Sequence, residues 1–276
     1  MSGSHGVSEH YTSGGLVGRI TAGVASLGKS IDTVTVDDLA PVDEFHIGGR
    51  QASEEFLSQL GLTAEKHVLD IGCGLGGAAR FVSSRYDCRV TGVDLTSEFV
   101  ETGREMCRWV GLERNVSLQQ GSALDMPFGD AEFDSAYMLH VGMNIEDKEH
   151  LGTEVARVIK SGSLFGVYDI MRTGQGELLY PVPWAAHAGL SSVVEPGRYK
   201  TALEAAGFEV VAERNRRDFA LDFFHALQTK TQFAGGPPPL GLHLLMGATA
   251  AEKIGNMVEN IRAGRIAPVE MIARKS

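Results

Sequence analysis

The sequence predicts an α/β protein built on a doubly wound, mostly parallel sheet. From residue 68 onward, short apolar runs alternate with helical patterns, and this alternation is typical of a parallel sheet with helices on both faces. A glycine-rich turn at residues 72–77 follows the first apolar run, and Asp94 ends the second. Ligands of such sheets bind beyond the carboxyl ends of the strands, so we expect a binding site where this turn and Asp94 meet.

Each element is predicted from its own local pattern. Before the sheet, residues 16–27 repeat apolar side chains at helical spacing, and residues 53–60 form a second expected helix. The expected strands, in chain order, are 68–71, 90–93, 116–118, 135–141, 164–168, 208–212 and 266–273. The expected helices among them are 78–86, one capped by Ser97, 147–160, one that ends at Gly207, 218–233 and 250–263.

Composition narrows the classes of partner. The 276 residues carry a formal net charge of −10, which argues against nucleic acid because its binding depends on clustered Lys and Arg. The short basic cluster Arg214, Arg216 and Arg217 is expected to lie on a solvated face. The three cysteines fit no metal or disulfide spacing, and no apolar run approaches the roughly 20 residues of a membrane span. We expect a cytoplasmic protein with a small-molecule partner and no metal, and a homodimer stays open.

Asp70 distinguishes between two kinds of nucleoside ligand. Gly72, Gly74 and Gly77 satisfy the pattern G-x-G-x-x-G, in which the pyrophosphate of a dinucleotide lies on the turn. A carboxylate two residues before the turn would face that negative charge, whereas S-adenosylmethionine carries an ammonium and a sulfonium group. Asp70 therefore favours S-adenosylmethionine, although a structural role in capping the turn stays open. Asp94 is expected to accept hydrogen bonds from the ribose hydroxyls.

Four segments in this order resemble the motifs of one family. They are residues 68–77 with Asp94, 120–128, 133–135 and 157–162. They are similar to class I S-adenosylmethionine-dependent methyltransferases, and closest to the small-molecule branch with the quinone, tocopherol and sarcosine/dimethylglycine enzymes. The resemblance covers about residues 11–274. It implies a Rossmann-like sheet of seven strands, whose antiparallel last strand lies beside the fifth.

The resemblance also implies a domain organisation. Residues 1–49 would form an N-terminal segment and helical cap over the cofactor, and residues 50–276 would form the class I methyltransferase domain. Within that domain, a loop at about 172–197 would contact substrate. A helical insertion at about 218–263 would precede the last strand.

The same resemblance implies the cofactor contacts. Leu95 would lie against the adenine ring, Ser122 at its amino edge, and Ala123 would offer a backbone N–H. Ser122 departs from the branch, which commonly has an acidic residue there, so this contact would carry no charge. The full expected set is Asp70, Gly72, Gly74, Gly76, Asp94, Leu95, Ser122, Ala123 and Leu139.

Other residues are candidates for binding the methyl acceptor. His140 ends the fourth strand and is a candidate general base because imidazole titrates near neutrality, with shaping of the pocket as the alternative. Asn144 would orient a substrate or begin a turn. Tyr180 and Trp184, in a proline-containing loop, would wall the pocket or anchor the loop. The candidates for a roof over the site are Tyr11, His46 and Arg50.

The expected reaction is methyl transfer from S-adenosylmethionine to a C, N or O nucleophile of a small molecule, with S-adenosylhomocysteine as product. Because the sulfonium is already activated, positioning and exclusion of water are expected to dominate an in-line displacement. Two alternatives from other classes stay open. One is a nicotinamide-dependent oxidoreductase, which Asp70 disfavours, and the other is a non-catalytic protein that binds S-adenosylmethionine.

Overall fold

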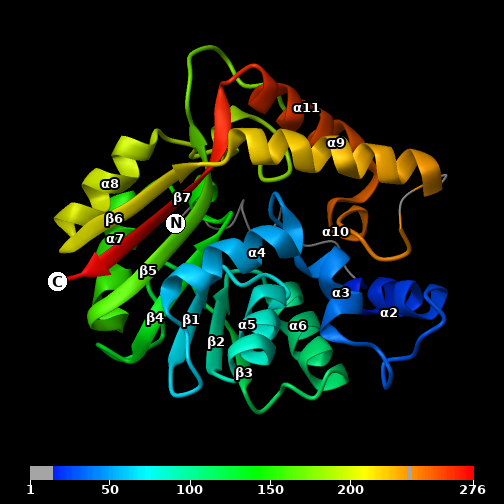
Figure 1. Ribbon diagram of the computed structural model, residues 1–276, viewed down its shortest axis with the longest axis horizontal. Coiled ribbons are helices and arrows are strands. Elements are labelled where there is room, and N and C mark those ends of the chain that lie inside the picture. The colour runs from blue at the N-terminus through cyan, green and yellow to red at the C-terminus, as the bar shows by residue number, and fades with distance from the viewer. Residues whose placement is uncertain (1–14, 235, 237) are drawn as a thin grey trace.

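A mixed seven-stranded sheet forms the centre of the molecule (Figure 1). The computed structural model describes residues 15–234, 236 and 238–276. The strand order is β3-β2-β1-β4-β5-β7-β6, and β7 alone runs antiparallel to its neighbours β5 and β6. The strands are β1 (His67–Ile71), β2 (Arg89–Asp94), β3 (Val116–Gln120), β4 (Phe133–Leu139), β5 (Ile159–Arg172), β6 (Phe208–Asn215) and β7 (Ile266–Lys275). The predicted fold class is confirmed, with the last strand inserted beside the fifth.

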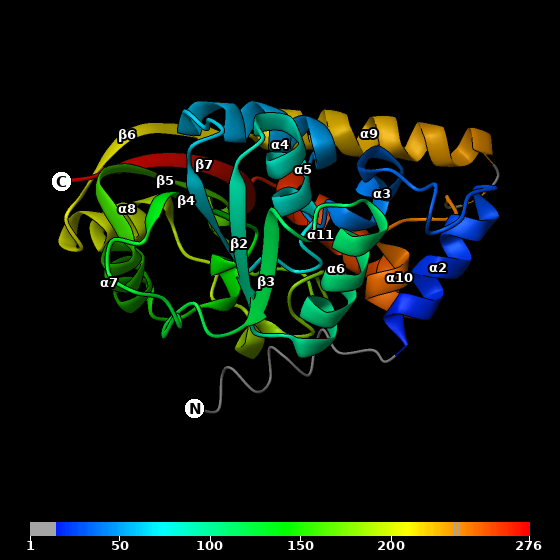
Figure 2. The same ribbon diagram turned by 90° about the horizontal axis from the view of Figure 1, so that it is seen from below.

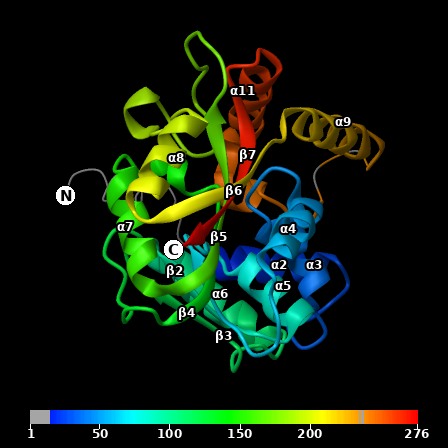
Figure 3. The same cartoon turned by 60° about the vertical axis from the view of Figure 1, so that its left-hand side comes forward.

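Side chains alternate between the two faces of the sheet along each strand, so both faces carry apolar side chains. Helices cover both of these faces. Figure 3 shows α7 (Lys148–Val158) and α8 (Pro196–Ala205) on one side, and α4 (Gly49–Leu57), α5 (Gly77–Tyr86) and α6 (Ser97–Trp109) on the other. In β1, Val68 packs in the same cluster as α4 to α6, while Leu69 packs in the cluster that contains α7 and α8. β5 extends beyond the expected strand at both ends. β7 pairs with it as far as Arg172, and Ile159 pairs with Phe133 of β4.

The N-terminal helices pack into a shared core at one end of the molecule. α2 (Leu16–Ser26), α3 (Val36–Asp43) and the short α10 (His243–Met246) lie together there (Figure 2). Their apolar side chains form one buried cluster with residues of the glycine turn and α6. The buried members of this cluster are Leu16, Ile20, Val24, Val34, Leu39, Val42, Leu75, Phe99, Met106 and Leu240.

A buried ion pair fastens α3 to α5. Arg80 Nη2 lies 2.6 Å from Asp43 Oδ1, and both side chains are fully buried. Arg80 Nη1 also donates to the backbone oxygens of Leu75, at 2.7 Å, and Gly103, at 3.2 Å. A Cβ at Gly77 would lie 2.4 Å from the Cβ of Asp43, so only glycine permits this approach of the two helices. Residues 15–49, called the cap below, are thereby attached to the helix that follows the glycine turn.

The expected helical insertion lies between β6 and β7. It contains α9 (Arg217–Ala234), α10, a 3₁₀ turn at Gly247–Thr249 and α11 (Ala250–Arg262). α9 and α11 lie side by side along one edge of the molecule (Figure 1). Among the described residues, no helix combines the length and apolarity that crossing a bilayer requires.

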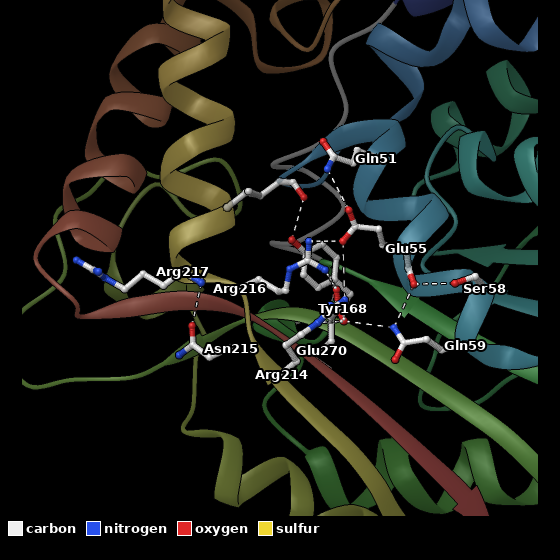
Figure 4. Close-up of polar contacts among 11 residues, drawn as sticks. Gln51, Glu55, Ser58, Gln59, Tyr168, Arg214, Asn215, Arg216, Arg217 and Glu270 are labelled. Atoms are coloured by element: carbon white, nitrogen blue, oxygen red, sulfur yellow. Dashed lines mark hydrogen bonds and ion pairs between the residues drawn. The ribbon is translucent and has the colours of Figure 1, made fainter.

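A polar network joins the beginning of this insertion to α4 (Figure 4). Glu270 of β7 is buried and lies 2.5 Å from Arg216 Nη1 and 2.7 Å from Arg214 Nη2. Arg216 Nη2 lies 2.7 Å from Glu55 of α4. The expectation of a solvated face is therefore wrong for Arg216, which is only 5% exposed. The distant partners Glu55 and Glu270 explain its burial.

Candidate active site

One cavity of about 460 Å³ lies beyond the carboxyl ends of the first four strands. It is bounded by the turns that follow the strands and by the cap. The lining includes residues 72–75, 94–96, 121–124, 139–141 and 144–147, together with Val42, Phe45 and His46 of the cap and the more distant Leu190 and Leu245. The predicted position of the site, at this edge of the sheet, is where the cavity lies.

The glycine turn lies against β2 and opens toward the cavity. Gly72 and Gly74 have φ angles of +70° and +52°, which favour glycine. Gly72 N donates to Val93 O at 2.8 Å, and a Cβ at Gly72 would lie 2.3 Å from Val141 Cγ2. A Cβ at Gly74 would meet only open space, so this position leaves the backbone accessible. Gly76 does not line the cavity, and its missing Cβ instead admits the side chain of Leu118.

Asp94 is fixed by two backbone donors at the end of β2. Its Oδ2 accepts from Gly74 N and its Oδ1 from Thr96 N, both at 2.8 Å. Burial raises the pKa of the Asp94 carboxyl, while these two N–H groups oppose the rise. A carboxylate has about four lone-pair sites, so each oxygen can still accept a hydrogen bond from a ligand in the cavity.

Asp70 is a buried carboxyl on the cavity wall with an unused acceptor. It is 2% exposed, and its Oδ2 has no hydrogen-bond partner among the described residues. Burial raises the pKa of Asp70 to about 8 and the nearby Asp94 carboxylate adds to the rise, while the neighbouring Tyr137 hydroxyl opposes it. Burying an acceptor without a hydrogen-bond partner costs free energy. The site is therefore suited to a ligand that brings a hydrogen-bond donor or a cation.

The turn after β3 forms a third wall. Leu95, Ser122 and Ala123 line the cavity as expected, with Leu124 beside them. Ser122 Oγ accepts from Leu124 N at 3.1 Å, so the hydroxyl holds the turn as well as facing the cavity. Apolar side chains with one polar group at their edge, as at this turn, suit the binding of a flat heterocyclic ring.

Two imidazoles lie edge to face on the cavity wall. The ring centroids of His46, in the cap, and His140, after β4, lie 6.0 Å apart, and the Tyr168 ring lies 5.1 Å from that of His140. His46 Nε2 lies 3.1 Å from Ser53 Oγ and 3.4 Å from Glu44 Oε2. Burial lowers the pKa of His46 to about 4 and lowers that of His140 well below its usual value. Both rings are therefore neutral at pH 7.

The structure does not bring every predicted residue to the cavity. Leu139 and Asn144 line it, but Tyr180 and Trp184 belong to a buried cluster beneath α9 and α11. Trp184 is 2% exposed and its Nε1 donates to Ser191 Oγ at 3.0 Å, so it anchors the loop. Arg50 lies away from the cavity, with its guanidinium 3.0 Å from Glu44 and stacked on Phe81. Tyr11 lies outside the described residues.

Sequence reasoning missed the group that supports the turn after β4. Lys148 is 2% exposed, and its Nζ donates to Gly142 O at 2.8 Å and to Ser192 O at 3.1 Å. Burial lowers the pKa of Lys148 to about 8, and the carboxylate of Asp169, which accepts from the Tyr199 hydroxyl, opposes the shift. These contacts fix the turn that carries Asn144. No local signal distinguishes Lys148 from an ordinary surface lysine at the start of a helix.

Comparison with known proteins assigns the central part of the chain to a family. Residues 69–167 match a family model described as a methyltransferase domain. These residues form a methyltransferase domain. They span most of β1, the strands β2, β3 and β4 and most of β5, so the segments whose motifs carried the resemblance lie within these residues almost entirely. The recognition made from those motifs is confirmed.

Relatives of the methyltransferase domain act on different molecules, as their names state. A sterol 24-C-methyltransferase of Eremothecium gossypii is 31% identical over 60% of this chain and 46% of its own length. An O-methyltransferase of Penicillium expansum is 27% identical over 84% of this chain and 83% of its own length. The chain thus spans about half the length of the sterol relative. In fold, it is similar to a geranyl diphosphate C-methyltransferase from Streptomyces coelicolor, with a TM-score of 0.72, 18% identity and coverage of 100% and 99% of the two chains.

Proposed function

We propose that this chain transfers a methyl group from S-adenosylmethionine to a small-molecule acceptor and releases S-adenosylhomocysteine. The observation that carries the proposal is the pair of carboxyls, Asp70 and Asp94, on the wall of one cavity within a methyltransferase domain. Asp70 Oδ2 is buried and lacks a partner among the described residues, which suits the ammonium group of the methyl donor. The pyrophosphate of a nicotinamide cofactor would instead bring no hydrogen-bond donor to this oxygen and would oppose ionisation of Asp70.

The other walls fit the remaining parts of the same ligand. Asp94 would accept from the two ribose hydroxyls, and the adenine ring would lie between Leu95 and the turn that carries Ser122 and Ala123. Gly74 leaves its backbone open to the ligand. When bound, S-adenosylmethionine supplies a methyl group on a positively charged sulfur. The chain itself would orient the acceptor, exclude water through the cap, and offer His140 to receive a proton.

The test compares three ligands with the whole chain by calorimetry. S-Adenosylmethionine and S-adenosylhomocysteine are expected to bind, and NAD is not. Incubation with methyl-labelled donor and a panel of metabolites is then expected to label an acceptor and to release S-adenosylhomocysteine. Tight NAD binding without a response to the methyl donor would refute the proposal. Donor binding without transfer to any acceptor would favour a non-catalytic binding protein.

Cofactor binding is expected to release a proton at pH 7. Free Asp70, with its pKa raised to about 8, is protonated at this pH, whereas the contact with an ammonium group requires the carboxylate. S-Adenosylhomocysteine affinity should therefore rise up to about tenfold from pH 6 to pH 7. Calorimetry in buffers of different ionisation enthalpy measures the released protons. Asp70→Asn should bind more weakly and abolish this pH dependence, and the same slope in that variant would show that another group titrates.

Replacing Ser122 by Asp is expected to preserve or tighten cofactor binding. An Asp side chain can accept from Leu124 N as Ser122 Oγ does at 3.1 Å, and it adds a charged acceptor for the adenine amino group. Calorimetry with S-adenosylhomocysteine measures the change. Ser117→Asp, at an exposed position on β3, is the matched control for the added charge. A large loss of affinity confined to Ser122→Asp would mean that adenine does not bind at this turn.

We also propose that the protein is cytoplasmic and that it binds small molecules and not nucleic acid. The net charge of −10 supports the proposal that nucleic acid is not a partner. The division between residues 1–49 and 50–276 stays a prediction, and so does a homodimer. The contact of α3 with α5 through Asp43 and Arg80 means that the cap would act as part of the site rather than as a separate unit.

A further inference from the structure

The charged side chains on the cavity wall have one sign. Among the described residues, every charged group that lines the cavity is a carboxyl, and these are Asp43, Asp70, Asp94, Glu146 and Asp147. Residues 1–14, 235 and 237 contain no Lys or Arg. Two cations that contact lining residues are already engaged: Arg80 is paired with Asp43 at 2.6 Å, and Lys148 Nζ donates to the backbone oxygens of Gly142 at 2.8 Å and Ser192 at 3.1 Å. A phosphate or carboxylate on the acceptor would therefore be desolvated without a cation to pair with it, which is unfavourable.

The acidic groups are not placed to hold a cationic acceptor either. Asp70 and Asp94 lie at the turns assigned to the methyl donor, and Asp43 is paired with Arg80. Glu146 and Asp147 are exposed at the rim. The part of the wall contributed by the cap, the end of β4 and the later segments is instead mostly apolar, and its polar members apart from the carboxyls named above are the two imidazoles, Asn144 and Ser192. Its apolar members are Val42, Phe45, Leu139, Val141, Ile145, Leu190 and Leu245.

His140 offers a polar contact in this apolar region. Its Nε2 is buried without a hydrogen-bond partner among the described residues. His46 does not fill this role, because its Nε2 lies 3.1 Å from Ser53 Oγ. A neutral imidazole carries one N–H and one bare nitrogen, and a hydroxyl both donates and accepts. A hydroxyl on the acceptor therefore satisfies His140 in either tautomer.

We propose, resting on the function proposed above, that the acceptor is an uncharged, largely apolar molecule whose hydroxyl oxygen binds at His140 and takes the methyl group. The new bond joins this oxygen to the methyl carbon. The bond from that carbon to sulfur breaks, and its electron pair goes to sulfur. The hydroxyl proton passes to the imidazole of His140 and from there to water, so His140 acts as a catalytic residue.

Matched naphthalene derivatives test the charge and the hydroxyl separately. The probes are 1-naphthol, 1-naphthoate, 1-naphthyl phosphate, 1-naphthylmethylamine and naphthalene, each titrated into the whole chain saturated with S-adenosylhomocysteine. We expect 1-naphthol to bind at least about tenfold more tightly than every other probe. Equal or tighter binding of a charged probe, or no binding of 1-naphthol up to its solubility limit, would overturn the inference. Failure of S-adenosylhomocysteine itself to bind would instead refute the proposed function.

His140→Gly tests the role of the imidazole without straining the backbone, since the φ angle of His140 is +55° and suits glycine. With S-adenosylmethionine present, the wild type is expected to form 1-methoxynaphthalene from 1-naphthol. The variant should lose about 100-fold or more in rate, keep S-adenosylhomocysteine affinity within about twofold, and regain rate when imidazole is added. His150→Phe, at an exposed position on α7, is the control. Binding of 1-naphthol without methylation, or a His140→Gly rate equal to wild type, would overturn the assignment.

Discussion

Asp94→Ala is expected to weaken S-adenosylhomocysteine binding by about 2–4 kcal/mol, which is roughly 30- to 1,000-fold in Kd. The two carboxylate oxygens are fixed at 2.8 Å by Gly74 N and Thr96 N, so they are already oriented before the ribose arrives. Losing the side chain removes the charged acceptors and also frees the glycine turn. Calorimetry of the folded variant measures the loss.

Asp134→Ala is the matched control for this change. Asp134 also accepts a backbone N–H beside a strand, that of His67 at 2.8 Å, but it does not line the cavity. Its replacement should leave the affinity within about twofold of wild type. A folded Asp94→Ala variant that binds equally well would show that the ribose lies elsewhere.

Asp43→Ala is expected to lower the free energy of unfolding by about 3–5 kcal/mol. The substitution would leave the fully buried guanidinium of Arg80 without its partner at 2.6 Å, beside the backbone oxygens of Leu75 and Gly103 and the sulfur of Cys107. Urea denaturation followed by circular dichroism measures the change. The result would establish how firmly the cap is joined to the methyltransferase domain.

Two further variants separate the charge effect from loss of the side chain. Asp37→Ala, exposed on the same helix, should change stability by no more than about 0.5 kcal/mol. The double change Asp43→Leu with Arg80→Met removes both charges and should recover much of the loss. A loss below about 1 kcal/mol for Asp43→Ala would mean that this ion pair contributes little to holding the cap.

The part of the site that the sequence predicts well is the part that strand ends determine. Asp70, Asp94, Ser122 and His140 each lie in or just after a strand of the parallel sheet, and the structure brings all of them to one cavity. The apolar runs and glycine turns that define those strands are local in sequence. Parallel pairing then places the carboxyl ends of the strands at one edge, so local patterns are sufficient.

Contacts between residues that are distant in the sequence determine the parts of the site and the fold that local patterns do not predict. Trp184 was expected beside the cavity or as an anchor of its loop, and only the packing against the insertion places it in the second role. Leu245 reaches the cavity from the insertion, although its sequence surroundings give no indication of this. Arg216 is buried because Glu55 and Glu270 lie 161 and 54 residues away in the chain and converge on it. No local pattern encodes such distant partners.

A crystal structure of the whole chain with S-adenosylhomocysteine tests the central claim most directly. The claim predicts the ribose hydroxyls about 2.5–2.9 Å from the carboxylate of Asp94, and the amino group at a similar distance from Asp70. It also predicts the adenine ring against Leu95 and the sulfur directed toward His46 and His140. Density for the ligand with Asp70 and Asp94 both out of contact would contradict the account.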